Sequence, residues 1–188
     1  MHTVSITNMV KTSRQQIIAT AEQLIMKTDS PDISLTQIST ELGITHGALY
    51  KHFNNKQALW TAVAATWFQR DIINNITIST HGSTKQQLHD WLWEFVNAKK
   101  NAFNTNAKMF ALNTFYIDNH PQALRQVLTN AYIQINQILK LPSDNYQHAE
   151  MILATFAIFT LPNFKDTWND PDYQQRFEAI WNLIKDGI

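Results

Sequence analysis

Glycine and proline are so scarce in this chain that long uninterrupted helices are the simplest structure it can form. The 188 residues include four glycines and five prolines, and these two residue types are the main local signals for turns. Between them, apolar residues recur at three- and four-residue spacing, which is the period of an amphipathic helix. The sequence therefore predicts an all-α fold with about nine helices.

Composition and motifs exclude several kinds of chemistry. The chain has no cysteine, so disulfides, thiolate catalysis and cysteine-based zinc sites are excluded. The seven histidines lack the H-x-x-x-H type of metal-ligand spacing. The sequence contains neither a glycine-rich phosphate loop nor a nucleophile elbow. We expect no metal, no cofactor and no enzymatic activity.

The chain also lacks the signals of a secreted or membrane protein. Its N-terminus has no signal-peptide apolar core, and no run approaches the ~20 apolar residues of a membrane span. The most apolar segment, residues 151–164, is shorter than that and contains Pro162. We expect a cytoplasmic protein that does not contact a membrane.

The first third of the sequence predicts four helices separated by clear turn signals. They cover about 13–27, 35–42, 46–53 and 56–75, and Gly43 ends the second of them. Two short helices joined by a tight turn with a glycine form a helix-turn-helix. The second helix of such a pair typically enters the major groove of DNA. The predicted N-caps are Ser13, Ser34, Thr45 and Asn54 or Asn55.

Charge around this motif favours contact with phosphate. The formal net charge of the chain is zero, so binding to nucleic acid requires a local patch. Residues 42–69 contain no Asp or Glu but include Lys51 and Lys56, and cations that contact phosphates release counterions. Such a stretch can arise by chance, and His46 and Tyr50 could be ordinary surface residues. The combination of caps, glycine turn and apolar spacing is what makes the interpretation specific.

Seven residues are predicted to contact DNA. We expect five of them to contact the sugar–phosphate backbone and two, at the start of the third helix, to lie nearest the bases. The backbone set is Thr36, Thr45, Tyr50, Lys51 and Lys56, and the base set is His46 and Gly47.

These residues resemble the DNA-binding signature of the tetracycline-repressor (TetR) family over about residues 13–65. Ser39 and Leu42 depart from the usual pattern in the packing helix, and His46 is an uncommon first residue for the reading helix. The matching elements are Thr36, Ile38-Ser39, Gly43-Ile44, Gly47-Ala48, Leu49-Tyr50-Lys51-His52-Phe53 and Lys56.

The resemblance implies a homodimer with two DNA-reading heads on a palindromic operator. It also implies a C-terminal domain that binds a small effector and moves the heads through the fourth helix. We therefore predict a helix-turn-helix domain over residues 1–56 and a helical ligand-binding and dimerisation domain over residues 57–188, linked by residues 56–75.

The rest of the chain predicts five more helices, over about 83–104, 107–117, 121–141, 146–161 and 171–185. The fourth of these is apolar almost all round and needs cover on several sides. With the fifth it could form half of a four-helix bundle across a twofold axis, or it could complete the core of a monomer. The predicted interface residues are Phe156, Phe159, Tyr173, Phe177, Ile180, Trp181 and Ile184.

A ligand site is the least specific of these predictions. Aromatic residues with a few polar groups among them suit a pocket for an apolar or aromatic effector, but each could equally belong to the core. The candidates are Trp67, Trp91, Phe95, Phe110, Asn113 and Tyr132.

Three functions remain at this stage. The first is a ligand-responsive transcriptional regulator, with repression as the family's commoner mode. The second is a regulator of the same fold that answers to a protein partner, or that activates, without a small-molecule effector. The third, an enzyme or carrier with a helical pocket, has no motif in its favour.

Overall fold

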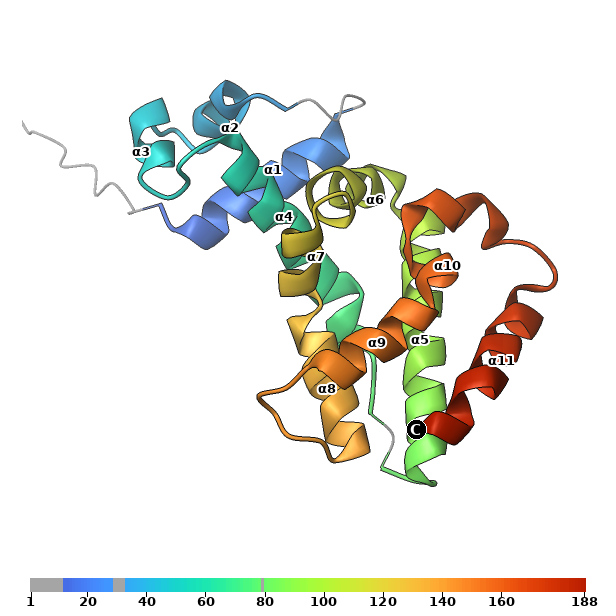
Figure 1. The fold of residues 1–188 in the computed structure, drawn as a ribbon. Coiled ribbons are helices and arrows are strands. Elements are labelled where there is room, and N and C mark those ends of the chain that lie inside the picture. Colours follow the sequence, from blue (N-terminus) through green and yellow to red (C-terminus); the bar gives the residue numbers. More distant parts are fainter. Residues whose placement is uncertain (1–11, 29–32, 79) are drawn as a thin grey trace, which may run out of the picture. The chain divides into compact units, whose positions relative to one another are not determined.

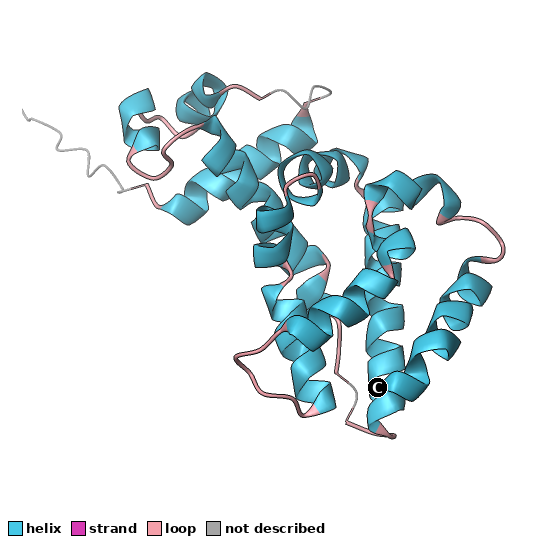
Figure 2. Ribbon diagram, in the orientation of Figure 1, coloured by secondary structure: helices cyan, strands magenta, loops and turns pink. Residues whose placement is uncertain are grey.

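The computed structural model describes residues 12–28, 33–78 and 80–188, and within these ranges the chain is helical with no strand (Figures 1 and 2). The predicted all-α fold is confirmed. The chain divides into two compact units, one that ends at Val63 and one that begins at Ala64. The division falls inside a single helix, α4 (Lys56–Asp71).

The N-terminal unit contains α1 (Arg14–Lys27), α2 (Leu35–Glu41), α3 (His46–Tyr50) and the first half of α4. The helix starts that the sequence predicted for this unit are capped. Ser13 and Ser34 each form a reciprocal capping box with the glutamine three residues later. Thr45 accepts a hydrogen bond from the Ala48 amide at 3.2 Å, and the Asn55 side chain accepts one from the Ala58 amide at 2.7 Å.

The turn between α2 and α3 depends on Gly43. Its φ of +63° lies in the left-handed region, which residues with a Cβ enter at a cost. The Gly43 amide bonds to the carbonyl of Thr40 at 3.1 Å, and the Ile44 amide bonds to that of Ser39 at 3.0 Å. These bonds satisfy the last carbonyls of α2 and direct the chain into α3, as a helix-turn-helix requires.

The C-terminal unit is an assembly of helices around α5 (Thr84–Thr105), the long green helix of Figure 1. α5 packs against α8 and α10. A short π-helical turn, η2 (Thr114–Asp118), continues α6. The other elements are η1 (Ile73–Asn75), α6 (Ala107–Asn113), α7 (Pro121–Val127), α8 (Thr129–Leu139), α9 (Gln147–Thr155), α10 (Ala157–Thr160), η3 (Pro162–Thr167), α11 (Tyr173–Ile184) and η4 (Lys185–Gly187).

Two predicted helices are each broken in two, so the described residues contain eleven α-helices rather than about nine. The helix predicted over 121–141 breaks at Leu128, and the one over 146–161 breaks at Phe156. Neither position is a glycine or a proline. Just before the second break the Thr155 hydroxyl donates to the Ile152 carbonyl at 2.7 Å, a type of back-bonding that bends helices.

Most of the residues predicted to form a dimer interface lie in the core of the C-terminal unit instead. Phe156, Phe159 and Phe177 are fully buried. The Phe177 ring lies 5.1 Å from that of Phe156 and 6.1 Å from that of Phe159, between ring centroids. Tyr173 and Trp181 are also buried, whereas Ile180 and Ile184 are half-buried. Of the predicted set, Ile180 and Ile184 are therefore the residues that remain accessible to a partner chain.

None of the helices in the described part of the chain is long and apolar enough to cross a membrane.

Candidate DNA-reading surface and effector cavity

The seven residues predicted to contact DNA are all exposed. Thr36 lies on α2, Thr45 is the N-cap of α3, and His46, Gly47 and Tyr50 are on α3 itself. Lys51 is the C-cap residue of α3, and Lys56 begins α4. About half of the Tyr50 surface is accessible. The side chains are therefore at the surface of the N-terminal unit, where a polyanion can reach them.

A hydrogen bond joins the packing helix to the reading helix. The Thr36 hydroxyl lies 3.2 Å from Nε2 of His46, and the His46 ring meets the Tyr50 ring edge-on with centroids 6.2 Å apart. Sequence reasoning assigned Thr36 to the phosphate backbone and did not foresee this contact. Because Thr36 engages Nε2, Nδ1 is the ring nitrogen of His46 that this contact does not use.

The helix starts of this unit carry no acidic residue. The first turns of α2, α3 and α4 contain neither Asp nor Glu. A helix N-terminus presents free amides and a partial positive charge, which favours anions. Lys56 adds a full charge at the start of α4. Helix starts without acids and an exposed lysine together make a surface suited to phosphate, and it lies on the helix-turn-helix formed by α2, the Gly43 turn and α3.

Comparison with known proteins identifies the kind of domain more closely. Residues 17–63 match the family described as bacterial regulatory proteins, tetR family. Over 56 residues the chain is 41% identical to the uncharacterized HTH-type transcriptional regulator TtgW of Pseudomonas putida. That match spans 30% of this chain and 42% of the relative's length, so it leaves most of both chains unmatched.

Solved structures extend the similarity of fold to nearly the whole chain. BioQ, crystallised with its natural double-stranded DNA operator, matches with a TM-score of 0.59 and 18% identity over 93% of this chain and 99% of its own. SCO0253, a TetR-family transcriptional regulator from Streptomyces coelicolor, matches with a TM-score of 0.55 and 19% identity over 94% of each chain. The family match therefore identifies a tetR-type DNA-binding domain over residues 17–63, and the two structures extend the similarity of fold, and of fold alone, to the rest of the chain.

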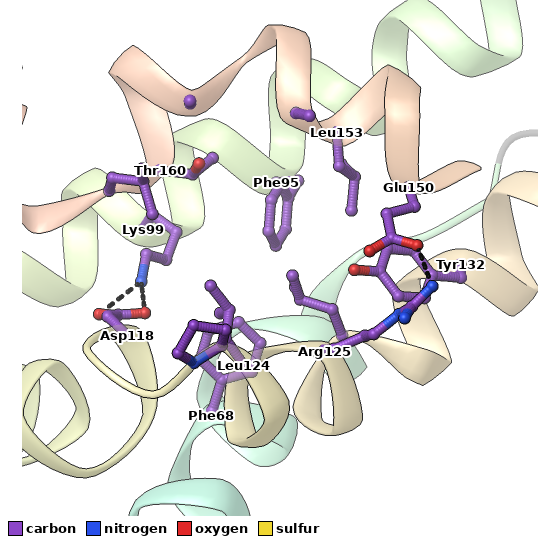
Figure 3. A pocket seen from close by; sticks show the side chains of 15 residues that line it. Phe68, Phe95, Lys99, Asp118, Leu124, Arg125, Tyr132, Glu150, Leu153 and Thr160 are labelled. Carbon is purple, nitrogen blue, oxygen red and sulfur yellow. Dashed lines mark hydrogen bonds and ion pairs between the residues drawn. The ribbon is translucent and has the colours of Figure 1, made fainter. Parts of the chain in front are cut away.

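The C-terminal unit contains a cavity of about 310 Å³ (Figure 3). This is at the lower end of the roughly 300–1,000 Å³ range of small-molecule sites. Its wall is mostly apolar, and residues from several separate elements contribute to it. The lining residues are Phe68 of α4; Phe95 and Lys99 of α5; Asp118 of η2; Pro121, Leu124 and Arg125 of α7, with Leu128 just after it; Tyr132 of α8; Glu150, Leu153 and Ala154 of α9; and Ala157 and Thr160 of α10, with Leu161 just after it.

A buried ion pair lies on one side of the cavity. The ammonium of Lys99 is 3.4 Å from each carboxylate oxygen of Asp118, and each side chain is 2% exposed. Asn113 donates a further hydrogen bond to Asp118 at 3.0 Å. The rings of Phe68 and Phe110 lie 5.3 and 5.4 Å from the Lys99 nitrogen. Burial lowers the pKa of Lys99, and the Asp118 carboxylate opposes that effect.

A second ion pair lies on the opposite side (Figure 3). Arg125 donates to Glu150 at 2.6 Å, and Tyr132 lies beside the pair. Burial and the nearby Glu150 carboxylate raise the pKa of the Tyr132 hydroxyl, while Arg125 acts against them. These three residues also line an open depression on the outer face. The pair therefore lies where the cavity adjoins this outer depression.

The predicted ligand residues are distributed unevenly around this cavity. Phe95 and Tyr132 line it. Phe110 and Asn113 lie behind its wall, against Lys99 and Asp118 respectively. Trp91 stacks on Phe95 with centroids 5.4 Å apart. Trp67 lines a different depression, with Arg70 and Asp71.

Sequence reasoning missed both ion pairs. One signal for the first was available, because Lys99 continues the apolar stripe of its helix, four residues after Phe95 and three before Ala102. A lysine at a core-facing position is rarely buried without a partner. The partner, Asp118, lies in a turn that no local pattern connects to α5. In the described part of the chain, no group of acidic or histidine side chains is arranged to hold a metal.

Proposed function

We propose that this protein is a homodimeric, ligand-responsive transcriptional regulator that reads a palindromic operator through α3. A small apolar or aromatic effector in the cavity would favour a conformation that no longer fits the operator, so that the protein acts as a repressor. The observation that carries the proposal is the mostly apolar cavity in the C-terminal unit of a chain with a tetR-type DNA-binding domain.

Helix α4 provides the connection between effector and DNA. It runs unbroken from Lys56 to Asp71, so one continuous helix begins at the proposed phosphate contact and supplies Phe68 to the cavity wall. A ligand shifts the equilibrium only if it binds one conformation more tightly than the other, and contact with Phe68 gives it a means of doing so.

Two features support a dimer. A single helix-turn-helix reads a short half-site, and two copies spaced by one DNA turn read a palindrome. The C-terminal unit also exposes large apolar side chains on the helices that the sequence assigned to dimerisation. Met151 of α9 is 55% exposed and Leu183 of α11 is 84% exposed.

The test begins with DNA that flanks the protein's own gene, measured at two salt concentrations. Tight binding that weakens as salt rises would support the DNA-binding role. Leu153→Trp, which places a larger ring in the cavity, should act as a built-in effector and weaken operator binding. Asn101→Trp, at an exposed position of α5 that does not line the cavity, is the matched control and should leave it unchanged.

Two outcomes would change the proposal. If the Leu153→Trp protein remains folded and its affinity for the operator is unchanged, control by a protein partner would be favoured over control by an effector. Binding without salt dependence would remove the assignment of Lys51 and Lys56 to phosphates.

A further inference from the structure

The charged groups around the cavity cancel in pairs. Four charged side chains line it, two basic and two acidic. Lys99 is matched by Asp118, and Arg125 is matched by Glu150. Between the two pairs the wall is formed by apolar side chains such as Phe95, Leu124 and Leu153 (Figure 3). The cavity therefore offers a ligand no net charge to neutralise.

Because Lys99 and Asp118 already neutralise each other, a charged ligand is disfavoured beside this buried pair. A ligand carboxylate near Lys99 would bring a second negative charge next to Asp118, and two carboxylates that share a site cannot both stay ionised cheaply. A ligand ammonium near Asp118 would meet Lys99 in the same way. Because both partners are buried, water screens little of this repulsion.

The Lys99 ammonium nevertheless has donor capacity to offer. An ammonium carries three N–H donors. Both of its contacts with Asp118 are 3.4 Å, whereas charge-assisted N–H···O bonds are typically about 2.7–2.9 Å. The Asp118 carboxylate also accepts a hydrogen bond from Asn113. The long contacts between Lys99 and Asp118 therefore leave part of the hydrogen-bonding capacity of the ammonium unused. A neutral oxygen at this side of the cavity could accept a better-aligned bond from Lys99.

We propose that the effector is an uncharged, mainly apolar molecule with a hydrogen-bond acceptor, such as a ketone, ester or ether oxygen, that binds Lys99. This inference rests on the proposed effector role of the cavity and specifies its ligand class. The apolar body of the molecule fills the space between the two ion pairs, and the acceptor lies at the buried pair, away from the outer opening beside Arg125 and Glu150.

The experiment uses three probes that share one skeleton and differ only in the head group. 2-Acetylnaphthalene carries a neutral acceptor, 2-naphthoate carries a charge, and 2-isopropylnaphthalene carries neither. Each head group has three heavy atoms, so shape is matched. The same three head groups on a heptyl chain form a second series of probes, which would fit if the cavity is too narrow for the naphthalene ring. Affinity for the full-length protein is measured by titration calorimetry without DNA.

We expect the ketone to bind most tightly in at least one skeleton. A hydrogen bond from a charged donor is worth about tenfold in affinity over the isopropyl probe, and the carboxylate should bind more weakly than the ketone by a similar factor or more. The double variant Lys99→Met, Asp118→Asn removes both charges and keeps an acceptor for Asn113. In that variant the preference for ketone over isopropyl should disappear, while binding of the isopropyl probe persists.

Three results would overturn the inference, and they differ in what they leave standing. Tightest binding of the carboxylate would show an anion site, and equal binding of ketone and isopropyl probes would show that Lys99 makes no contact. Either result leaves the cavity as an effector site. Failure of all six probes to bind would also reject the ligand class. The Leu153→Trp measurement on the operator then decides separately whether the cavity controls DNA binding.

Discussion

The two units of this chain present their candidate sites in opposite ways. In the N-terminal unit the DNA-directed residues are exposed, and all of them lie between Thr36 and Lys56. In the C-terminal unit the candidate site is a cavity that opens to the surface beside Arg125, and residues from Phe68 to Leu161 contribute to its wall. The first site uses charge and helix ends at a surface, and the second uses shape and compensated charge in an interior.

This difference explains why the sites respond differently to sequence change. A surface that contacts DNA loses affinity in proportion to the contacts removed, and the fold hardly depends on it. A cavity shares its wall with the core, so a change there alters stability as well as binding. Function and folding can therefore be separated by mutation in the N-terminal unit more cleanly than in the C-terminal unit.

The largest effect is expected from Phe177→Ala. Phe177 is fully buried and lies within 4.9 Å of Trp93 and 5.4 Å of His89, between ring centroids. Its truncation should lower the free energy of unfolding by about 3–5 kcal/mol, as measured by chemical denaturation. Gln175→Ala, at an exposed position of the same helix, should change it by less than about 0.5 kcal/mol. Equal effects would mean that Phe177 is not a core residue.

The next largest effect is expected on the affinity for operator DNA. Tyr50→Ala with Lys51→Ala should weaken operator binding about 100-fold, because two contacts are lost at roughly 1.4 kcal/mol each. The unfolding midpoint should stay unchanged, since both side chains are exposed. Lys165→Ala, which removes an exposed charge from the other unit, is the control and should bind like the unsubstituted protein. A loss of stability in the double variant would mean that DNA binding and folding cannot be separated in the N-terminal unit either.

A single lysine should produce a smaller and more specific change. Lys56→Ala should reduce affinity about fivefold for operator and non-operator DNA alike, as expected of a phosphate contact. The slope of log affinity against log salt should fall in magnitude by about one. Lys56→Arg keeps the charge and should keep the slope. An unchanged slope in Lys56→Ala would show that the start of α4 does not meet a phosphate.

The last of the expected effects comes from Arg125→Ala at the mouth of the cavity, and it concerns the rate of ligand entry more than stability. Arg125 is 69% exposed, and exposed ion pairs contribute no more than about 1 kcal/mol. The substitution should instead speed entry of 2-acetylnaphthalene, which stopped-flow measurement of association would detect. Lys165→Ala breaks a comparable exposed pair away from the cavity and should leave the association rate unchanged. Slower entry would place the opening elsewhere.

Local chemistry was enough to predict the N-terminal unit from sequence. Ser13, Ser34 and Thr45 cap the helices they were expected to cap, and Gly43 adopts the left-handed conformation at the turn. Each of these signals acts over three or four residues, so no knowledge of the tertiary fold is needed. The seven DNA contacts themselves remain predictions, but the exposure that they require is present.

The C-terminal unit was predictable only as helices. Its breaks at Leu128 and Phe156 fall at residues that favour neither turns nor helix ends, and at the second break Phe156 packs against the rings of Phe159 and Phe177. Lys99 and Asp118 are nineteen residues apart in sequence and meet only because α5 and η2 pack together. Interactions of this kind depend on the completed fold.

The stacking of Trp91 on Phe95 gives the protein an optical reporter of its own cavity. Phe95 forms part of the wall, and the Trp91 indole lies nearly parallel to it, with an interplanar angle of 15°, and donates its N–H to Gln134 at 2.7 Å. A molecule that displaces the Phe95 ring would change the surroundings of a buried indole. Occupancy of the cavity should then be visible as a change in tryptophan emission, without any label attached to the protein.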